Sequence, residues 1–147
     1  MTIRNLELKD LEQVFNLLNE LYEGKIQYDV FNKKYRNNLQ DNNFYGILAE
    51  ENDKITGVLI SRLINRLAKS KDILFVDDLI VNKDYRRNGI GKLLLQNATN
   101  YAIDKNCETI ELVSYITNEN SHRFYESNGF KKQYYKFKKS IKGENIL

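Results

Sequence analysis

Near the middle of the chain, a strand-like run leads through a glycine-containing turn into a helical pattern. Residues 73–81 are apolar except for Asp77 and Asp78, which favours a buried strand. From Gly89 to Asn106 apolar residues recur at helical spacing, and Thr109 to Tyr115 has the pattern of another strand. A strand, a crossover helix and a second strand place two parallel strands in one sheet, with the helix packed across it. The sequence therefore predicts an α/β fold of mixed α and β elements.

Further elements are expected on both sides of this central unit. Thr2–Leu6 alternates as a short strand, and the pair Asp10 and Gln13 resembles a capping box before an apolar helical stripe that runs to Tyr22. The remaining expected elements are a helix over 30–39, hairpin strands over 44–50 and 54–64, a helix over Asn120–Ser127 and a final strand over Gln133–Lys139. Because no linker or repeat interrupts the chain, residues 1–147 are expected to form a single domain.

Composition excludes several classes of function. The 23 basic and 20 acidic residues leave a net charge of only +3, too small and too mixed for a dedicated nucleic-acid binder. One cysteine, Cys107, and one histidine, His122, exclude a disulfide framework and a Cys/His zinc site, and no metal is expected. No apolar run approaches the ~18 residues of a membrane span. We therefore expect a cytoplasmic protein that binds neither nucleic acids nor membranes.

The turn before the central helix has the features of a phosphate site. In Asp84–Lys92 two glycines allow a ligand to approach the backbone closely, and the first amides of the helix have no acceptor within it. Arg86, Arg87 and Lys92 add positive charge beside those amides. The turn has neither the Lys-Ser/Thr of a Walker A loop nor the glycine pattern of a dinucleotide-binding loop. It is expected to hold a pyrophosphate, with a plain glycine turn and solvated arginines as the alternative.

Three short motifs follow one another along the chain. The turn is Arg86-Arg-Asn-Gly-Ile-Gly91, the strand before it is Val76-Asp-Asp-Leu-Ile-Val81, and Asn118–Phe130 contains Asn, Phe-Tyr and Gly-Phe in that order. Together they resemble the coenzyme A turn, the acetyl-group strand and the C-terminal segment of the GCN5-related N-acetyltransferases (GNAT). Arg87 stands where that family often has Gly, and Ser121 where it often has Ala. Arg87 affects the details of the diphosphate contact, and neither departure is expected to abolish coenzyme A binding.

The resemblance implies both a fold and a reaction. The implied GNAT fold is a central mixed, mostly antiparallel sheet of about six to seven strands with a splayed parallel pair, flanked by about four helices. The implied reaction is direct transfer of an acetyl group from acetyl-CoA to the primary amine of a small molecule (polyamine-like, aminoglycoside-like or amino-acid-like) in a ternary complex. A homodimer is compatible with the resemblance, because many members of the family pair. The residues implied to bind acetyl-CoA are Leu79, Ile80, Val81, Arg86, Arg87, Asn88, Gly89, Ile90, Gly91, Lys92, Asn118 and Tyr125.

The resemblance also assigns catalytic residues. Tyr125 matches the family tyrosine whose hydroxyl points at the coenzyme A sulfur, and it is expected to be the general acid. The amine needs a proton acceptor, because a lysine-like pKa of ~10.4 keeps it protonated at neutral pH. Strand alternation sends Asp77 and Asp78 to opposite faces. Asp77 is preferred because it matches a carboxylate of polyamine acetyltransferases, with Asp78 or a water relay as alternatives, and Asp77, Asp78 and Tyr28 are the expected acceptor-binding residues.

Other functions stay open from the sequence alone. A protein N-terminus or lysine as acceptor needs an open groove, whereas a small amine needs a closed pocket. A non-catalytic acyl-CoA-binding module would not need a general acid, and Tyr125 argues against it. Lys131–Lys139 mixes lysines with aromatics as RNA-binding strands can, although an exposed edge strand explains this pattern more simply. Neither His122 nor Cys107 is expected to act in catalysis.

Overall fold

The computed structural model describes residues 1–142. The chain divides into two compact units, one from Met1 to Leu112 and one that begins at Val113. The first unit contains a β-sheet with helices on it, and the second contains the helix α4 (Glu119–Ser127). None of the helices in the described residues is long and apolar enough to cross a membrane.

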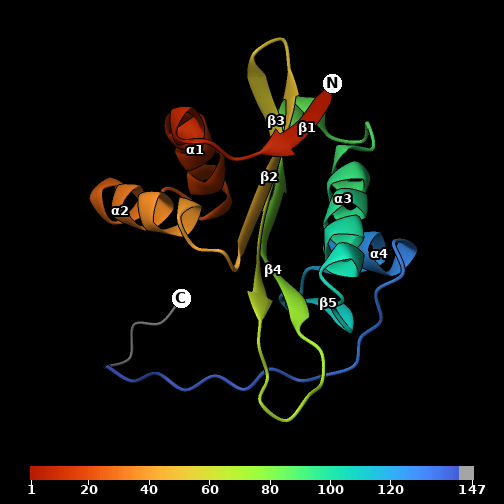
Figure 1. Cartoon of the computed structure of the whole chain (residues 1–147). Coiled ribbons are helices and arrows are strands. Elements are labelled where there is room, and N and C mark those ends of the chain that lie inside the picture. Colours follow the sequence, from red (N-terminus) through yellow and green to blue (C-terminus); the bar gives the residue numbers. More distant parts are fainter. Residues whose placement is uncertain (143–147) are drawn as a thin grey trace. The chain divides into compact units, whose positions relative to one another are not determined.

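The first unit is built on a five-stranded sheet in the order β1-β2-β3-β4-β5 (Figure 1). The strands are β1 (Thr2–Asn5), β2 (Phe44–Glu51), β3 (Lys54–Ile64), β4 (Ile73–Val81) and β5 (Thr109–Leu112). Neighbours from β1 to β4 are antiparallel, and β4 and β5 are parallel. This mixed sheet confirms the predicted fold class, with five strands in the described chain where about six or seven were expected.

Helices cover both faces of the sheet. Figure 1 shows α1 (Leu11–Leu21) and α2 (Tyr28–Leu39) on one side and α3 (Ile90–Asp104) on the other. Two 3-10 helices, η1 (Leu8–Asp10) and η2 (Lys83–Tyr85), come before α1 and between β4 and α3. The crossover from β4 through α3 to β5 is the strand, helix and strand unit that the sequence predicts.

A hydrophobic core fills the space between the sheet and the helices α1 and α2. Val58, Ile60 and Ile80 from the strands form one buried cluster with Val14 and Leu18 of α1. Side chains of α1 reach this core because its apolar residues recur every three or four positions. Apolar burial of this kind contributes about 25 cal/mol per Å² removed from water. It therefore holds the helical layer on the strands that also carry the candidate site.

An ion cluster fixes the start of this layer. The Arg4 guanidinium donates two hydrogen bonds to the Asp10 carboxylate, at 2.8 and 2.9 Å, and two to Glu50, at 3.0 and 3.1 Å. Asp10 is buried and also accepts the Glu7 amide at 2.8 Å. Because these groups come from β1, β2 and the residues around η1, the cluster joins the sheet to the helix that follows.

The opposite face of the sheet packs closely on α3. A Cβ at Gly57 would lie 2.9 Å from Ile90 Cγ2 and 3.1 Å from Leu94 Cδ1, so only glycine fits between β3 and the first turns of α3. Farther along α3, the rings of Tyr45 and Tyr101 stack in parallel, with centroids 3.7 Å apart and 1° between the planes. These contacts position the N-terminus of α3 against the sheet.

In the second unit, the predicted helix over Asn120–Ser127 is confirmed as α4, which begins one residue earlier. The predicted final strand over Gln133–Lys139 is wrong, because these residues have no strand pairing in the described chain. Tyr134, Tyr135 and Phe137 are 86%, 87% and 93% exposed, respectively. Alternating lysines and aromatics give a strand-like pattern, but a strand also needs a partner edge.

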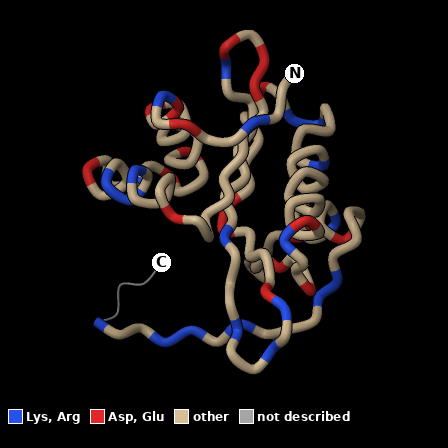
Figure 2. Tube along the Cα trace, viewed as in Figure 1, with Lys and Arg blue, Asp and Glu red and all other residues tan. Residues whose placement is uncertain are grey.

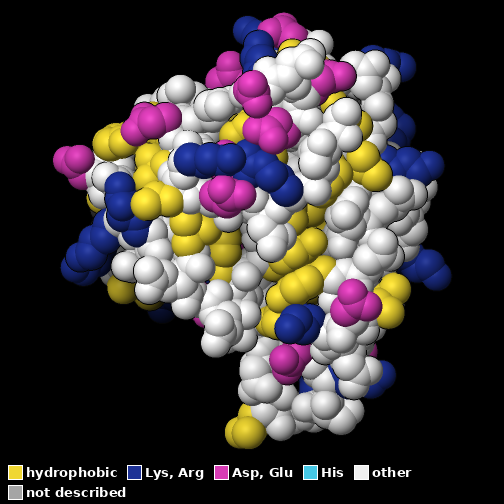
Figure 3. Space-filling model, turned by 45° about the horizontal axis from the view of Figure 1, so that its top comes forward, with side chains coloured by type: hydrophobic (Ala, Val, Ile, Leu, Met, Phe, Trp, Pro, Cys, Tyr) yellow, Lys and Arg dark blue, Asp and Glu magenta, His cyan; other side chains and the backbone are white. Residues whose placement is uncertain are grey.

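Charge is mixed over the first unit and one-signed between residues 131 and 142. Figure 2 shows both acidic and basic positions on α2 and on the β2–β3 hairpin and only acidic ones on α1, whereas the charged residues from 131 to 142 are all lysines. On the face drawn in Figure 3, Lys and Arg side chains likewise lie beside Asp and Glu, with hydrophobic side chains between them. The structure thus presents no broad basic surface on this face.

Candidate active site

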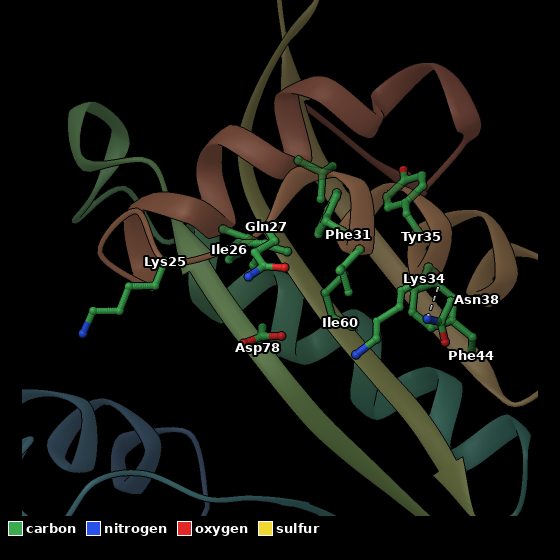
Figure 4. Close-up of a pocket in the computed structure, with 13 residues that line it drawn as sticks. Lys25, Ile26, Gln27, Phe31, Lys34, Tyr35, Asn38, Phe44, Ile60 and Asp78 are labelled. Carbon is green, nitrogen blue, oxygen red and sulfur yellow. Dashed lines mark hydrogen bonds between the residues drawn. The ribbon is translucent and has the colours of Figure 1, made fainter. Parts of the chain in front are cut away.

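A cavity of about 400 Å³ lies in the first unit, among α1, α2 and the strands β2, β3 and β4 (Figure 4). Its volume falls near the lower end of the range of about 300–1,000 Å³ for small-molecule sites. Most of the lining is apolar, and the polar part comes from a few side chains. The lining residues are Val14, Leu18, Lys25, Ile26, Gln27, Val30, Phe31, Lys34, Tyr35, Asn38, Phe44, Ile60 and Asp78.

Asp78 is the only acidic residue among those that line the cavity. It stands on β4 directly opposite Ile60 of β3, and its carboxylate accepts a hydrogen bond from the Tyr22 hydroxyl. Burial raises the pKa of Asp78, and the neighbouring Asp77 also raises it, while the hydrogen bond from Tyr22 lowers it. The net effect is a raised pKa. A carboxyl group of this kind is suited to accept a proton from a ligand in the cavity.

A β-bulge places both aspartates on the same face of the sheet. On β3 the successive residues Ile60 and Ser61 pair with Asp78 and Val76, so Asp77 is the extra residue of β4. Asp77 accepts a hydrogen bond from Arg62 Nε at 2.8 Å. Because Ile60 and Arg62 are two positions apart on β3, the partners of both aspartates lie on one face. The expectation that alternation separates Asp77 from Asp78 is therefore wrong.

The two carboxylates have different surroundings. Asp77 forms an exposed ion pair with Arg62 and does not line the cavity, whereas Asp78 is partly buried and does. Tyr28, the third expected acceptor-binding residue, is also not among the lining residues. Its ring packs edge-on against Phe15, and its hydroxyl donates a hydrogen bond to Glu12. Helix α2 therefore lines the cavity with residues other than Tyr28.

Sequence reasoning missed Lys34 and Ile60 as cavity residues. Lys34 follows Val30 by four positions on α2, which puts both on one side of the helix. That spacing was the available signal, because Val30 belongs to the predicted apolar stripe. Ile60 gave no signal of its own, since every strand of a buried sheet carries such residues.

Beyond the cavity, β4 extends farther along the sheet than its parallel neighbour β5. The pairing with β5 ends at Val76 and Leu112, while β4 continues to Val81. From Asp77 to Val81 the edge of β4 that faced β5 therefore has no strand partner in the described residues. The residues Leu79–Val81, expected to contact a cofactor through their backbone, lie on this open stretch.

The turn after β4 presents free donors at the start of α3. Gly89, the N-cap, has a φ of +77°, and a Cβ there would meet open space. Arg87 is also left-handed, with a φ of 65°, which explains the preference for glycine at this position of the turn. Leu93 makes the first helical hydrogen bond, to Gly89, and no described residue accepts the amides of residues 90–92. Such amides and the helix dipole attract anions.

The arginines and the asparagine of the turn differ in their partners. Arg86 Nε donates to the Val81 carbonyl at 3.1 Å, so this side chain folds back onto the end of β4. Asn88 Nδ2 donates to the Tyr85 carbonyl at 3.1 Å, which closes the turn. Arg87 and Lys92 are exposed beside the free amides. Free amides, an unobstructed glycine and two exposed cations fit the diphosphate of coenzyme A.

The second unit carries the two remaining expected residues. Asn118 is the N-cap of α4, and its side chain accepts the Ser121 amide at 3.3 Å. The Tyr125 ring packs edge-on against Phe124 and Phe130, with centroids 5.4 and 5.7 Å apart. No group of three or more His, Cys, Asp or Glu side chains within residues 1–142 is arranged to hold a metal ion.

Comparison with known proteins identifies the class. A model of the Acetyltransferase (GNAT) family matches residues 11–130, so the chain belongs to the GNAT family and is an acyltransferase. Aminoalkylphosphonate N-acetyltransferase of Salmonella typhimurium is 28% identical over 139 residues, which cover 95% of this chain and 90% of that protein.

Solved structures agree with this assignment. An aminoglycoside acetyltransferase from an uncultured soil metagenomic sample, in complex with trehalose, has a TM-score of 0.83 and 26% identity, with 96% of each chain covered. An aminoglycoside N-acetyltransferase in complex with CoA has a TM-score of 0.84 and 18% identity, with 95% of this chain and 93% of that chain covered. The second comparison is a likeness of fold.

Proposed function

We propose that this protein is an acetyl-CoA-dependent N-acetyltransferase that acts on the primary amine of a small molecule. The observation that carries the proposal is the Asp78 carboxylate in the wall of a cavity, on a strand whose open edge leads to the Arg86–Lys92 turn. A cavity of about 400 Å³ has the size of a site for a small acceptor. Relatives named for aminoalkylphosphonate and aminoglycoside acetylation support this choice.

The donor side of the proposal uses the turn and the end of β4. The amides of residues 90–92, with Arg87 and Lys92, would hold the diphosphate of acetyl-CoA, and Leu79–Val81 and Asn118 would contact its pantetheine arm. When bound, acetyl-CoA supplies the acetyl group as a thioester. A backbone amide within Leu79–Val81 would donate to the thioester oxygen while negative charge develops there.

The acceptor side uses Asp78 as the proton acceptor. An amine with a pKa of ~10.4 is mostly protonated at neutral pH, which costs roughly 4 to 5 kcal/mol if nothing removes the proton. Burial raises the pKa of Asp78 and so makes it a better base than an ordinary carboxylate. Asp77 is less suitable because Arg62 already binds its carboxylate. After the amine has lost one proton to Asp78, its nitrogen bonds to the acetyl carbon, and the C–S bond then breaks. Tyr125 is proposed to give its proton to the departing sulfur, and the second proton lost by the nitrogen replaces it.

The test measures free thiol released from acetyl-CoA with a panel of small amines and a panel of peptides. We expect turnover with small amines, and Asp78→Asn should lower kcat/KM by about 10²- to 10⁴-fold. Asp77→Asn is the matched control, since it removes the neighbouring carboxylate, and it should cost less than about tenfold. Turnover confined to peptides, or a larger loss in Asp77→Asn than in Asp78→Asn, would overturn the proposal.

A further inference from the structure

We propose that the acceptor is a small zwitterion, an aliphatic amine that also carries an anionic group, with the amine at Asp78 and the anion at Lys34. Both side chains line the same cavity, Asp78 from β4 and Lys34 from α2. This inference rests on the proposed function, because it names the substrate class of that site. It makes Lys34 the residue that determines which amines are accepted.

Of the two lysines that line the cavity, Lys34 is the one without an acidic partner in the described residues. Lys25, the other lysine of the lining, forms an ion pair with Glu23 at 3.4 Å, whereas Lys34 has no ion pair within residues 1–142. In Figure 4 the Lys34 side chain extends past Ile60, while that of Lys25 points away from the other labelled residues. An anion in the cavity would therefore meet Lys34 without displacing an acidic partner.

The balance of charge argues against polycationic acceptors. A polyamine or an aminoglycoside carries several ammonium groups and needs several carboxylates around it, but the lining offers one, Asp78, beside the cation Lys34, while Lys25 is paired with Glu23. A plain alkylamine would bring a second positive charge into a cavity that already contains Lys34. A zwitterion matches one negative and one positive wall group, and such complementarity gives specificity.

The apolar part of the lining sets the nature of the spacer. Phe31 and Ile60 are cavity residues along with Val14 and Phe44, so the chain between the two charged ends contacts hydrocarbon. Burial of methylene groups there is favourable. The acceptor is therefore expected to be an ω-amino acid or ω-aminoalkylphosphonate with hydrocarbon between its two charged ends.

The experiment compares acceptors of matched length: an ω-aminoalkylphosphonate, an ω-amino acid, the n-alkylamine and the diamine. With the native chain, kcat/KM for either zwitterion should exceed that for the n-alkylamine by about tenfold or more. Lys34→Met keeps the aliphatic stem and should reduce this ratio toward one, mainly through KM. Lys34→Glu should raise the activity on the diamine relative to the zwitterions, a gain that misfolding cannot produce. Comparison of kcat/KM for the ω-aminoalkylphosphonate with that for the ω-amino acid shows which anionic group the site prefers.

Lys33→Met is the matched control, because Lys33 is the adjacent lysine of α2 and does not line the cavity. It should leave the ratio between zwitterion and alkylamine as in the native chain. If no amine on the panel is acetylated, the proposed function itself fails. If amines are acetylated without preference for zwitterions, or if Lys34→Met leaves the ratio unchanged, this inference alone is overturned.

Discussion

At the scale of single residues, the hydrogen bond from the Tyr22 hydroxyl counteracts the effect of burial on the pKa of Asp78. Burial raises the pKa of this carboxyl, and the hydrogen bond from Tyr22 stabilises its charged form and lowers the pKa. Tyr22 is thus a positioning residue, which orients the carboxylate and sets the pH range in which Asp78 is ionised.

Removal of this hydroxyl should move the pH profile of the enzyme. In Tyr22→Phe the pKa of Asp78 should rise further, so the acidic limb of kcat/KM should shift to higher pH. The measurement is a pH profile of kcat/KM for the amine. Tyr28→Phe, which removes a hydroxyl bound to Glu12 outside the cavity lining, should leave the limb in place. A limb that moves to lower pH in Tyr22→Phe would contradict the assignment.

Tyr125 allows a similarly small change in the second unit. Tyr125→Phe keeps the ring that packs on Phe124 and Phe130 and deletes only the hydroxyl. Loss of the proposed general acid should reduce kcat by about 10²- to 10³-fold with acetyl-CoA affinity nearly intact. Steady-state kinetics at saturating acetyl-CoA provides the measurement, with Tyr115→Phe as a control at an exposed tyrosine of the same unit. Native turnover in folded Tyr125→Phe would leave the hydroxyl without a catalytic role.

At the scale of elements, the turn before α3 combines two left-handed residues with free amides. Acetyl-CoA bound there at about 100 times its Kd should add about 2.7 kcal/mol to the free energy of unfolding. Gly89→Asp should abolish the resulting rise in Tm, because it places a carboxylate beside the diphosphate. A thermal unfolding series with and without ligand measures this shift.

Gly89→Ala separates charge from backbone strain in the same experiment. Both variants force a residue with a Cβ into a φ of +77°, at a cost of roughly 1–2 kcal/mol, but the added Cβ meets no atom within 4 Å. The alanine variant should therefore start from a lower Tm and keep most of the ligand-induced rise. An equal loss of that rise in both variants would show that the turn's conformation matters and its charge does not.

Most helices and strands could be predicted from the sequence, because the apolar periodicity that indicates each one lies within the element itself. The predicted strand over 54–64 coincides with β3, and the predicted helix over Gly89–Asn106 differs from α3 by one or two residues at each end. The bulge at Asp77 could not be predicted, because it is a mismatch between two strands and leaves no mark in either one. The absent strand over Gln133–Lys139 has a related cause, since amphipathic alternation carries no information about a partner edge.

The candidate site was predictable to the extent that it is made of contiguous residues. The turn with Gly89 is such a segment, and its left-handed glycine and free amides follow from the sequence. Lys34 is one of two adjacent lysines on α2, and its spacing of four positions from Val30 is the sequence signal that distinguishes it from Lys33. Asp78 was identified as a candidate, but its environment depends on the bulge.

At the scale of the whole molecule, the Arg4 cluster couples stability to pH. Burial raises the pKa of Asp10, but hydrogen bonds from Arg4 and from the Glu7 amide lower it by more, so the folded-state pKa is below the usual value. A group of this kind stabilises the fold above its unfolded pKa of ~3.9, and the contribution is lost as the pH falls through the folded pKa.

Arg4→Met should therefore be strongly destabilising at neutral pH. It leaves the buried Asp10 carboxylate without its partner, at an expected cost of about 3–5 kcal/mol. The cost should shrink in acid, because without Arg4 burial favours the protonated form of Asp10 in the variant, and urea unfolding at pH 7 and pH 4 compares the two conditions. Arg62→Met, which breaks the exposed pair with Asp77, should cost only about 0–1 kcal/mol. Equal costs for the two variants at pH 7 would contradict this account of the cluster.

The stacked rings of Tyr45 and Tyr101 give the protein an optical reporter of its own. The chain contains ten tyrosines and no tryptophan, so its near-ultraviolet absorption and emission are dominated by tyrosine. Two rings held in parallel at 3.7 Å couple electronically, and this pair joins β2 to α3. A near-ultraviolet circular dichroism band from the pair would disappear when α3 leaves the sheet. Detachment of the helix whose first turn forms the proposed acetyl-CoA site could then be followed without any attached label.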